Sequence, residues 1–173
     1  LKTKKLKRIM KKTNEKNKLV NFFRTKKFVE ENYEADKQLI IDKYNELGYR
    51  DAVIVVDSVT PHDEKTVNVY MEIDEGQKYY LRNVTWVGNT LYSTERLNYM
   101  LRMNKGDVYN QKLLSERTLE DEDAIGNMYY NNGYLFYSLE PVEVNIVGDS
   151  IDLEMRIYEG RQATINKVSI NGN

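Results

Sequence analysis

An internal repeat with a period of 84 residues constrains the fold of this chain more than any other feature. The segment 79–90, YYLRNVTWVGNT, has the pattern of a β-strand that ends in a Gly-Asn turn. A second version stands at 163–173, ATINKVSINGN. Four positions match at this spacing: Val84 with Val168, Trp86 with Ile170, Gly88 with Gly172, and Asn89 with Asn173.

Two further patterns recur at nearly the same spacing. Val67, Val69, Met71 and Ile73 alternate with polar residues before Glu75-Gly76, and Ile151, Leu153, Met155 and Ile157 do the same before Glu159-Gly160. Upstream, Tyr44 followed by Gly48-Tyr49 returns as Tyr129 followed by Gly133-Tyr134. Alternation of this kind marks a strand with one buried face. Agreement at so many fixed offsets indicates tandem copies of one unit.

The complete copy is expected at 77–160 and has the predicted order β-α-α-β-β. After the first strand, Ser93 is typical of the N-cap of a short helix. A longer helix is predicted from about 110 to 132, ended by Gly133. Two strands then pair across the tight turn Gly148-Asp149.

The copy at 1–76 is predicted to be incomplete, because no strand precedes its helices. A short basic helix and a basic insertion at 11–27 lead to a helix and two strands. These three elements are expected at Val29–Leu47, Asp51–Val59 and Thr66–Asp74. Residues 161–173 are predicted to be the first strand of a third copy, either disordered or paired with an exposed sheet edge. The expected fold is α+β, with tandem modules of two helices packed on a three-stranded mixed sheet.

Positive charge gathers at the start of the chain. Residues 1–27 hold twelve Lys and Arg against one acid, a net of +11, so the rest carries −12 of the overall −1. The residues of this basic patch considered as a partner site are Lys4, Lys5, Lys7, Arg8, Lys11, Lys12, Lys16 and Lys18. The patch is compatible with a solvated lysine face, with anionic lipid headgroups or an acidic protein, or with nucleic acid.

Nothing in the sequence predicts catalysis or a cofactor. The chain has no cysteine and no glycine-rich phosphate motif, and no apolar run reaches the ~18–20 residues of a membrane helix. His62, the only histidine, precedes Asp63 and Glu64, which together could touch a metal. A polar hairpin loop after Pro61 explains the same residues more simply.

Two aspartates are predicted to be buried structural residues. Asp121 lies on the helical line of Leu114, Thr118 and Ile125, which should face the sheet. Asp36 holds the same place 85 positions earlier. We expect both carboxylates to be at least partly buried and to accept hydrogen bonds, because an unpaired carboxylate there would be costly.

The chain resembles POTRA domains. The resemblance rests on the order of its elements, the period of the repeat, the helix that ends in Gly-Tyr, and the strands that end in Glu-Gly and Gly-Asn. POTRA domains are the polypeptide-transport-associated repeats of the BamA superfamily of outer-membrane assembly and translocation proteins. The resemblance implies a non-enzymatic scaffold on the periplasmic side of the bacterial outer membrane. It would receive unfolded β-barrel proteins, dock accessory lipoproteins and precede its own C-terminal β-barrel.

Two other functions stay open at this point. One is a POTRA array of a secretion or translocation relative. The other is a basic nucleic-acid-binding module, although the POTRA resemblance gives no reason to expect nucleic acid.

The repeat also predicts where a client strand would add. If the first strand pairs with the last, the second strand of each unit is left as an edge. In the first unit this edge is apolar on both faces and comprises Ala52, Val53, Ile54, Val55 and Val56. In the second unit, Pro141 and Glu143 weaken the corresponding stretch Val142–Ile146 as a pairing template. We expect strand addition at Ala52–Val56, unless a helix or a neighbouring unit covers it.

Overall fold

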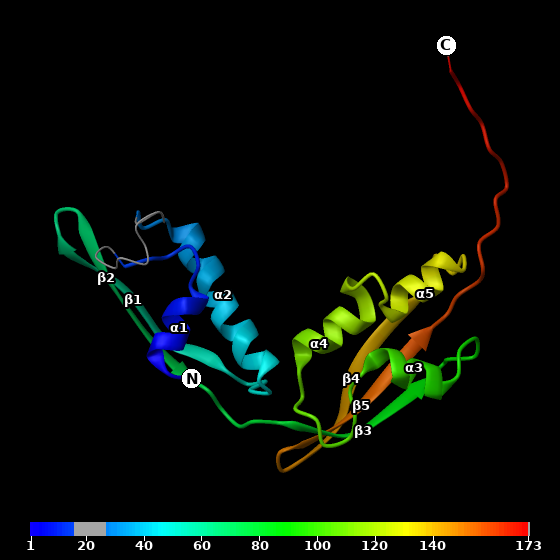
Figure 1. The fold of residues 1–173 in the computed structure, drawn as a ribbon, viewed down its shortest axis with the longest axis horizontal. Helices are drawn as coiled ribbons and strands as arrows, with labels where there is room; N and C mark the ends of the chain where they lie inside the picture. The colour runs from blue at the N-terminus through cyan, green and yellow to red at the C-terminus, as the bar shows by residue number, and fades with distance from the viewer. Residues whose placement is uncertain (16–26, 173) are drawn as a thin grey trace. The chain divides into compact units, whose positions relative to one another are not determined.

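The computed structural model describes residues 1–15 and 27–172, which fall into two compact units, Leu1–Lys78 and Tyr79–Asn173 (Figure 1). Each unit combines helices with a β-sheet, so the predicted α+β class is confirmed. The two units are described separately below as unit 1 and unit 2.

Unit 1 packs two helices on an antiparallel hairpin. Its elements are α1 (Thr3–Ile9), α2 (Glu30–Glu46), β1 (Val53–Asp63) and β2 (Thr66–Asp74). Strand β1 extends four residues beyond the predicted end at Val59, so His62 lies in the strand and the turn follows it. Among the described residues the sheet of this unit has two strands, in contrast to the three of a complete module.

Helix α2 buries one line of side chains in unit 1. Tyr33, Asp36, Ile40 and Tyr44 are its buried residues, at the three- and four-residue spacings of one helix face. Glu30 and Glu31 stand in its first turn, where negative charge complements the helix dipole. The fully buried cluster of unit 1 is small and contains Ile40, Tyr44 and Ala52. Leu6, Ile9 and Met10 of the α1 region pack against it.

Unit 2 follows the predicted order β-α-α-β-β, except that its second helical segment is divided, and its last strand is central in the sheet. Its elements are β3 (Tyr80–Val87), α3 (Thr94–Leu101), α4 (Gln111–Ser115), η2 (Glu116–Glu120), α5 (Ile125–Asn131), β4 (Ser138–Val147) and β5 (Ser150–Tyr158). The sheet order is β3-β5-β4, with β3 parallel and β4 antiparallel to β5. The second strand of this unit, β4, is therefore an edge, as the sequence predicted.

The prediction of one continuous helix over 110–132 is wrong. The segment contains α4, one turn of π-helix and α5, with residues 121–124 between the last two. The Thr118 hydroxyl donates to the Leu114 carbonyl, which competes with regular helix geometry. The backbone N–H of Asp121 then bonds to Glu116 five residues back, and Asp121 is extended with ψ 153°. Glu120 and Asp123, three residues apart, would also repel each other on one face of a continuous helix.

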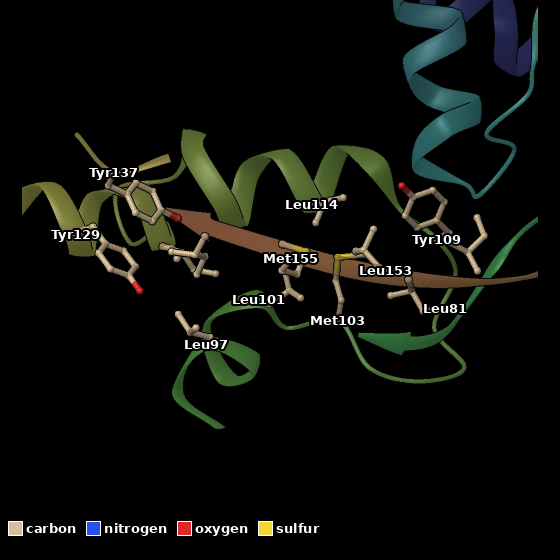
Figure 2. Close-up of a cluster of buried hydrophobic side chains, with 13 residues drawn as sticks. Leu81, Leu97, Leu101, Met103, Tyr109, Leu114, Tyr129, Tyr137, Leu153 and Met155 are labelled. Atoms are coloured by element: carbon tan, nitrogen blue, oxygen red, sulfur yellow. The ribbon is translucent and has the colours of Figure 1, made fainter. Parts of the chain in front are cut away.

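Strand β5 organises the core of unit 2 (Figure 2). Its alternate residues Ile151, Leu153 and Met155 are at most 1% exposed. They pack in one cluster with Leu81 of β3 and with side chains from α3, α4 and α5, including Leu97, Leu101, Leu114, Ile125 and Tyr129. A strand flanked by two neighbours and covered on one face buries every second side chain completely.

Gly88 at the end of β3 shows why one repeated glycine is required. Its φ is +87°, and a Cβ atom there would lie 2.0 Å from the carbonyl oxygen of Ile157. A side chain would therefore meet both backbone strain and a clash with β5.

The tail that follows β5 is extended and forms no strand pairing through residue 172 (Figure 1). The Ala163 N–H donates to the Gly133 carbonyl at 2.7 Å, which ties the start of the tail to the end of α5. Further along, Ile165, Val168 and Ile170 are 84%, 71% and 90% exposed.

Candidate protein-binding edges

The outer edge of β1 is exposed and apolar. Strand β1 pairs with β2 on one side, and no other described strand pairs with it. Val53, Val55 and Val56 are 49%, 52% and 40% exposed, whereas Ala52, just before the strand, is buried. None of the described helices of unit 1 therefore covers Val53 or Val55. An edge of this composition is a template for pairing with another chain.

A β-bulge lies within this predicted edge, and the sequence analysis did not anticipate it. Ile54 lies opposite Ile73 and Val56 lies opposite Glu72, which leaves Val55 as the extra residue. A bulge interrupts the ladder and increases the local twist. Regular pairing with β2 resumes at Val56, so an added strand would meet a bent edge at Val55 and a regular one beyond it.

The edge strand of unit 2 borders an open groove. The groove has a volume of about 550 Å³ and lies between β4 and the α4–η2 segment. Its lining includes Leu114, Thr118 and Leu119 on the helical side and Pro141 and Glu143 on the strand side. Strand β4 has its own bulge at Val144, between the pairs Glu143–Leu153 and Asn145–Asp152. Both candidate edges therefore carry a bulge, and they differ in proline, charge and the neighbouring groove.

Asp36 is fully buried, at 0% exposed, and anchors the start of the basic segment. Its carboxylate accepts the backbone N–H groups of Lys11, Lys12 and Thr13 at 2.9, 3.0 and 2.5 Å. This geometry fixes the chain after α1 against α2 and satisfies a carboxylate that would otherwise be costly to bury.

The basic patch is exposed in the part of the chain that the structure describes. Lys4, Lys5, Lys7 and Arg8 lie on α1, and Lys11 and Lys12 follow it. Lys7 is paired with Glu15 at 2.5 Å. Lys16 and Lys18 lie outside the described residues.

Asp121 is at least partly buried, as expected, but it pairs with Arg117 where Asp36 binds backbone amides, which corrects the equivalence of role drawn from their spacing. It lies in the break after η2, where its carboxylate is 3.2 Å from Arg117. Its side chain is 32% exposed, so it is partly buried rather than enclosed. The helix phase used to compare the two aspartates fails because the helix ends one residue before Asp121.

The sequence analysis missed a contact that joins the two repeated motifs. The Tyr129 hydroxyl donates to Glu159 at 2.9 Å, and the Tyr44 hydroxyl donates to Glu75 at 2.8 Å. The Tyr-x₃-Gly-Tyr and Glu-Gly motifs of each unit thus meet in space. Their shared recurrence at 84 and 85 residues was the signal that could have revealed the contact.

In unit 2 the same glutamate also binds the loop after β3. Glu159 accepts the backbone N–H groups of Thr90 and Leu91, each at 2.9 Å. Burial raises the pKa of Glu159, but the hydrogen bonds from Thr90, Leu91 and Tyr129 outweigh it, so the pKa is lowered overall. Burial and this carboxylate raise the pKa of Tyr129. The glutamate therefore ties the last strand to the connection between β3 and α3.

Two kinds of feature are missing from the described part of the chain, a cluster of metal ligands and a helix able to cross a membrane. Across residues 1–15 and 27–172, no three His, Asp or Glu side chains are grouped so that they could hold a metal ion. His62 lies on β1, 3.5 Å from the Asn68 amide. Of the helices in these same ranges, none has the length and apolarity needed to cross a membrane.

Comparison with known proteins identifies the repeats. The family described as POTRA, surface antigen variable number repeat, matches residues 1–76 and 79–160. The outer membrane protein assembly factor BamA of Neorickettsia risticii is 28% identical over 131 residues, which cover 70% of this chain and 18% of that protein. BamA of Neisseria meningitidis serogroup B is 24% identical over 125 residues, which cover 68% of this chain and 16% of that protein.

A solved structure shares the fold. The crystal structure of Haemophilus influenzae BamA POTRA3-5 matches with a TM-score of 0.72 and 25% identity, covering 100% of this chain and 66% of that one. The chain spans less than a fifth of the length of the BamA relatives named above. With the family match extending over nearly the whole sequence, the chain belongs to the POTRA family.

Proposed function

We propose that this chain is part of a periplasmic scaffold of an outer-membrane protein assembly machine. Its POTRA membership and its likeness to two BamA proteins support this role. The observation that carries the proposal is the exposed apolar edge of β1 in a fold of this family. On this proposal the chain binds and positions other proteins and performs no reaction.

The client class is an unfolded β-barrel protein that adds one strand to the sheet. Backbone hydrogen bonds to a sheet edge give affinity without a fixed client sequence, and exposed apolar side chains give additional contact. The edge at Ala52–Val56 suits this because it has no proline and no charge within the stretch. On β4, Pro141 lacks an N–H donor and Glu143 adds charge, so we place client addition on β1 in preference.

Other partners follow from the same role. Accessory lipoproteins and the protein's own β-barrel are the partners that a POTRA scaffold would hold. The exposed lysines of α1 suit anionic headgroups at a membrane surface. Membership of a secretion or translocation system remains the alternative within the superfamily.

The two bulge residues provide a matched test of client binding. Val55 on β1 and Val144 on β4 are 52% and 47% exposed and hold the same kind of position. Val55→Pro should lower photocrosslinking of an unfolded β-barrel client to a probe at Val53 several-fold, while Val144→Pro should leave it unchanged. Circular dichroism would check that both variants stay folded. Loss of crosslinking with Val144→Pro alone would place the client on β4 and overturn the preference for β1.

A separate measurement addresses nucleic acid. Binding of single-stranded and duplex DNA is measured at low salt, where phosphate contacts are strongest. Affinity that disappears when Lys4, Lys5, Lys7 and Arg8 are replaced by glutamine would favour the nucleic-acid function over the scaffold.

A further inference from the structure

The space between helix and edge strand that is an open groove in unit 2 is filled by side chains in unit 1. Tyr33 of α2 is 2% exposed, and its hydroxyl donates to the carboxylate of Asp57 on β1. The Lys37 ammonium lies 2.5 Å from the same carboxylate and 5.1 Å from the centroid of the Tyr33 ring. An aromatic ring, a base and an acid therefore join α2 to β1.

Unit 2 has different residues in the places of the ring and the acid. Thr118 follows Tyr33 by 85 positions and is buried to the same extent. Pro141 holds the place of Asp57 in the sheet, since each lies opposite a methionine of the repeated strand. Thr118 and Pro141 both line the groove beside β4. Threonine lacks the ring of tyrosine and proline lacks a carboxylate, so the contact that joins helix and strand in unit 1 is not made at these positions.

The groove combines an apolar wall with negative charge. Leu114, Leu119 and Leu139 line it, and Leu119 is 55% exposed. Glu143 lies opposite Leu153, which packs with the helices, so the Glu143 side chain is on the groove side of β4. The described residues of the lining include two glutamates and no lysine or arginine. The groove therefore offers apolar contact next to a site for a positive charge.

A π-helical turn forms part of the apolar wall. Thr118 and Leu119 belong to η2. Gly126 of α5 approaches both of them closely, because a Cβ atom there would lie 3.1 Å from the Thr118 carbonyl oxygen and 3.6 Å from Leu119 Cδ2. Single π-helical turns are frequent at functional sites. The local backbone is thus consistent with a binding role for this wall.

We propose that this groove binds a segment of a partner protein in which an aromatic residue stands next to a lysine or arginine. The aromatic ring takes the space that Tyr33 fills in unit 1, and the base pairs with Glu143 as Lys37 pairs with Asp57. Aromatic and arginine side chains are common anchors of protein interfaces, because they bury a large apolar body beside a polar or charged end. The site needs no backbone pairing with β4, so Pro141 does not prevent it. It is separate from strand addition on β1.

A pair of peptides tests the aromatic anchor by NMR on the whole chain. The probe is Gly-Ser-Tyr-Lys-Gly-Ser with blocked ends, and the control peptide has alanine in place of tyrosine. The tyrosine peptide should shift the methyl signals of Leu114, Leu119 and Leu139 in a saturable way. The alanine peptide should bind about tenfold more weakly, because it lacks the anchor that fills the groove.

Two matched variants test the charge. Glu143→Gln and Glu154→Gln each remove one negative charge, from neighbouring strands of one sheet. Glu154 lies between the buried residues Leu153 and Met155, so its side chain is on the face away from the groove. Glu143→Gln should weaken the tyrosine peptide about threefold, as for a partly exposed ion pair, and less so at high salt. Glu154→Gln should leave its affinity unchanged.

Filling the groove from within is a third test. Thr118→Tyr combined with Pro141→Asp places the ring and the acid of unit 1 in unit 2. In this variant the tyrosine peptide should no longer bind, while circular dichroism shows that the chain is folded. If the double variant does not fold, the comparison of Glu143→Gln with Glu154→Gln decides.

Three results would overturn the proposal. The first is that the tyrosine peptide gives no saturable shift, or binds no better than the alanine peptide. The second is that Glu143→Gln and Glu154→Gln have equal effects. The third is a shift of the Leu119 signal with protein concentration alone, which would assign the groove to a second copy of this chain. Client crosslinking at Val53 is measured separately, so failure here leaves the proposed scaffold function intact.

Discussion

The two units share one sequence repeat, yet unit 2 has a far larger buried core than unit 1. Among the residues that the structure describes, three form the buried cluster of unit 1 and thirteen form that of unit 2. The alternation of apolar residues is equally clear in β2 and β5. The comparison teaches that an apolar pattern specifies which face of a strand is inward, while the neighbouring strand decides how much of that face is buried.

The units also differ in how a matched acidic position is used. Asp36 sits inside a continuous helix and binds three backbone amides. Asp121, 85 residues later, follows a π-helical turn and pairs with Arg117. The tyrosine–glutamate contact, in contrast, is the same in both units. The two units therefore share the tyrosine–glutamate contact, whereas the helix that is continuous in unit 1 is divided in unit 2.

The largest effect should come from removing a matched leucine from each core. Leu6, Ile9 and Met10 repeat the spacing of Leu97, Met100 and Leu101. Leu97→Ala should lower the stability of unit 2 by about 2–5 kcal/mol, because Leu97 is fully buried and the change leaves a cavity. Leu6→Ala should cost unit 1 about 1 kcal/mol, since the side chain is only partly buried.

Amide hydrogen exchange, followed by mass spectrometry on the whole chain, would measure each unit separately. Equal losses of protection for Leu97→Ala and Leu6→Ala would contradict the expectation that unit 2 depends more on its buried core than unit 1.

Replacing the two aspartates should give the next largest effect. Asp36→Ala should destabilise unit 1 by about 3 kcal/mol, because the amides of Lys11, Lys12 and Thr13 lose a charged acceptor. Asp121→Ala should cost less than about 1 kcal/mol, as expected for a partly exposed ion pair. Urea unfolding measured by circular dichroism would give both values. A cost for Asp121→Ala as large as that for Asp36→Ala would restore the equivalence that the structure contradicts.

The smallest effect concerns Glu159 and depends on pH. Its folded-state pKa lies below the ordinary value of 4.5, so the ionised carboxylate stabilises the fold. Glu159→Gln should reduce the stability of unit 2 by about 1–2 kcal/mol at pH 7. The difference from the unmodified chain should shrink as the pH falls below about 4.5 and through the lowered folded pKa.

Glu140→Gln, a change of the same kind at an exposed residue of β4, is the control. A Glu159→Gln difference that stays constant from pH 7 to pH 3 would show that the lost stability does not come from the charge.

Sequence reasoning succeeded where a pattern is local and repeated. Alternation at Ile151, Leu153 and Met155 predicted a half-buried strand, and the 84-residue period predicted tandem copies of one unit, two of which match the POTRA family. It failed where two local preferences compete. The Thr118 hydroxyl and the acidic run after it end the helix at Glu120. Neither feature forms a periodic pattern in the sequence, so neither predicted this break.

The candidate edges also show a limit of prediction from sequence. The start of β1 was predicted to within two residues, but its longer end and the bulge at Val55 depend on how two strands pair across a hairpin. Such register is set jointly by both strands and their turn, so one strand's sequence does not determine it.

The parallel pairing of β3 with β5 has a consequence for the order of folding. Strands β4 and β5 are joined by a two-residue turn and can pair as soon as both are made. Strand β3 must instead wait for a partner that lies 70 residues later, from Tyr80 to Ser150. Contacts between such distant residues form slowly because a long loop must close first. We therefore expect β3 to dock last, after the hairpin has formed and its helices have collapsed onto it.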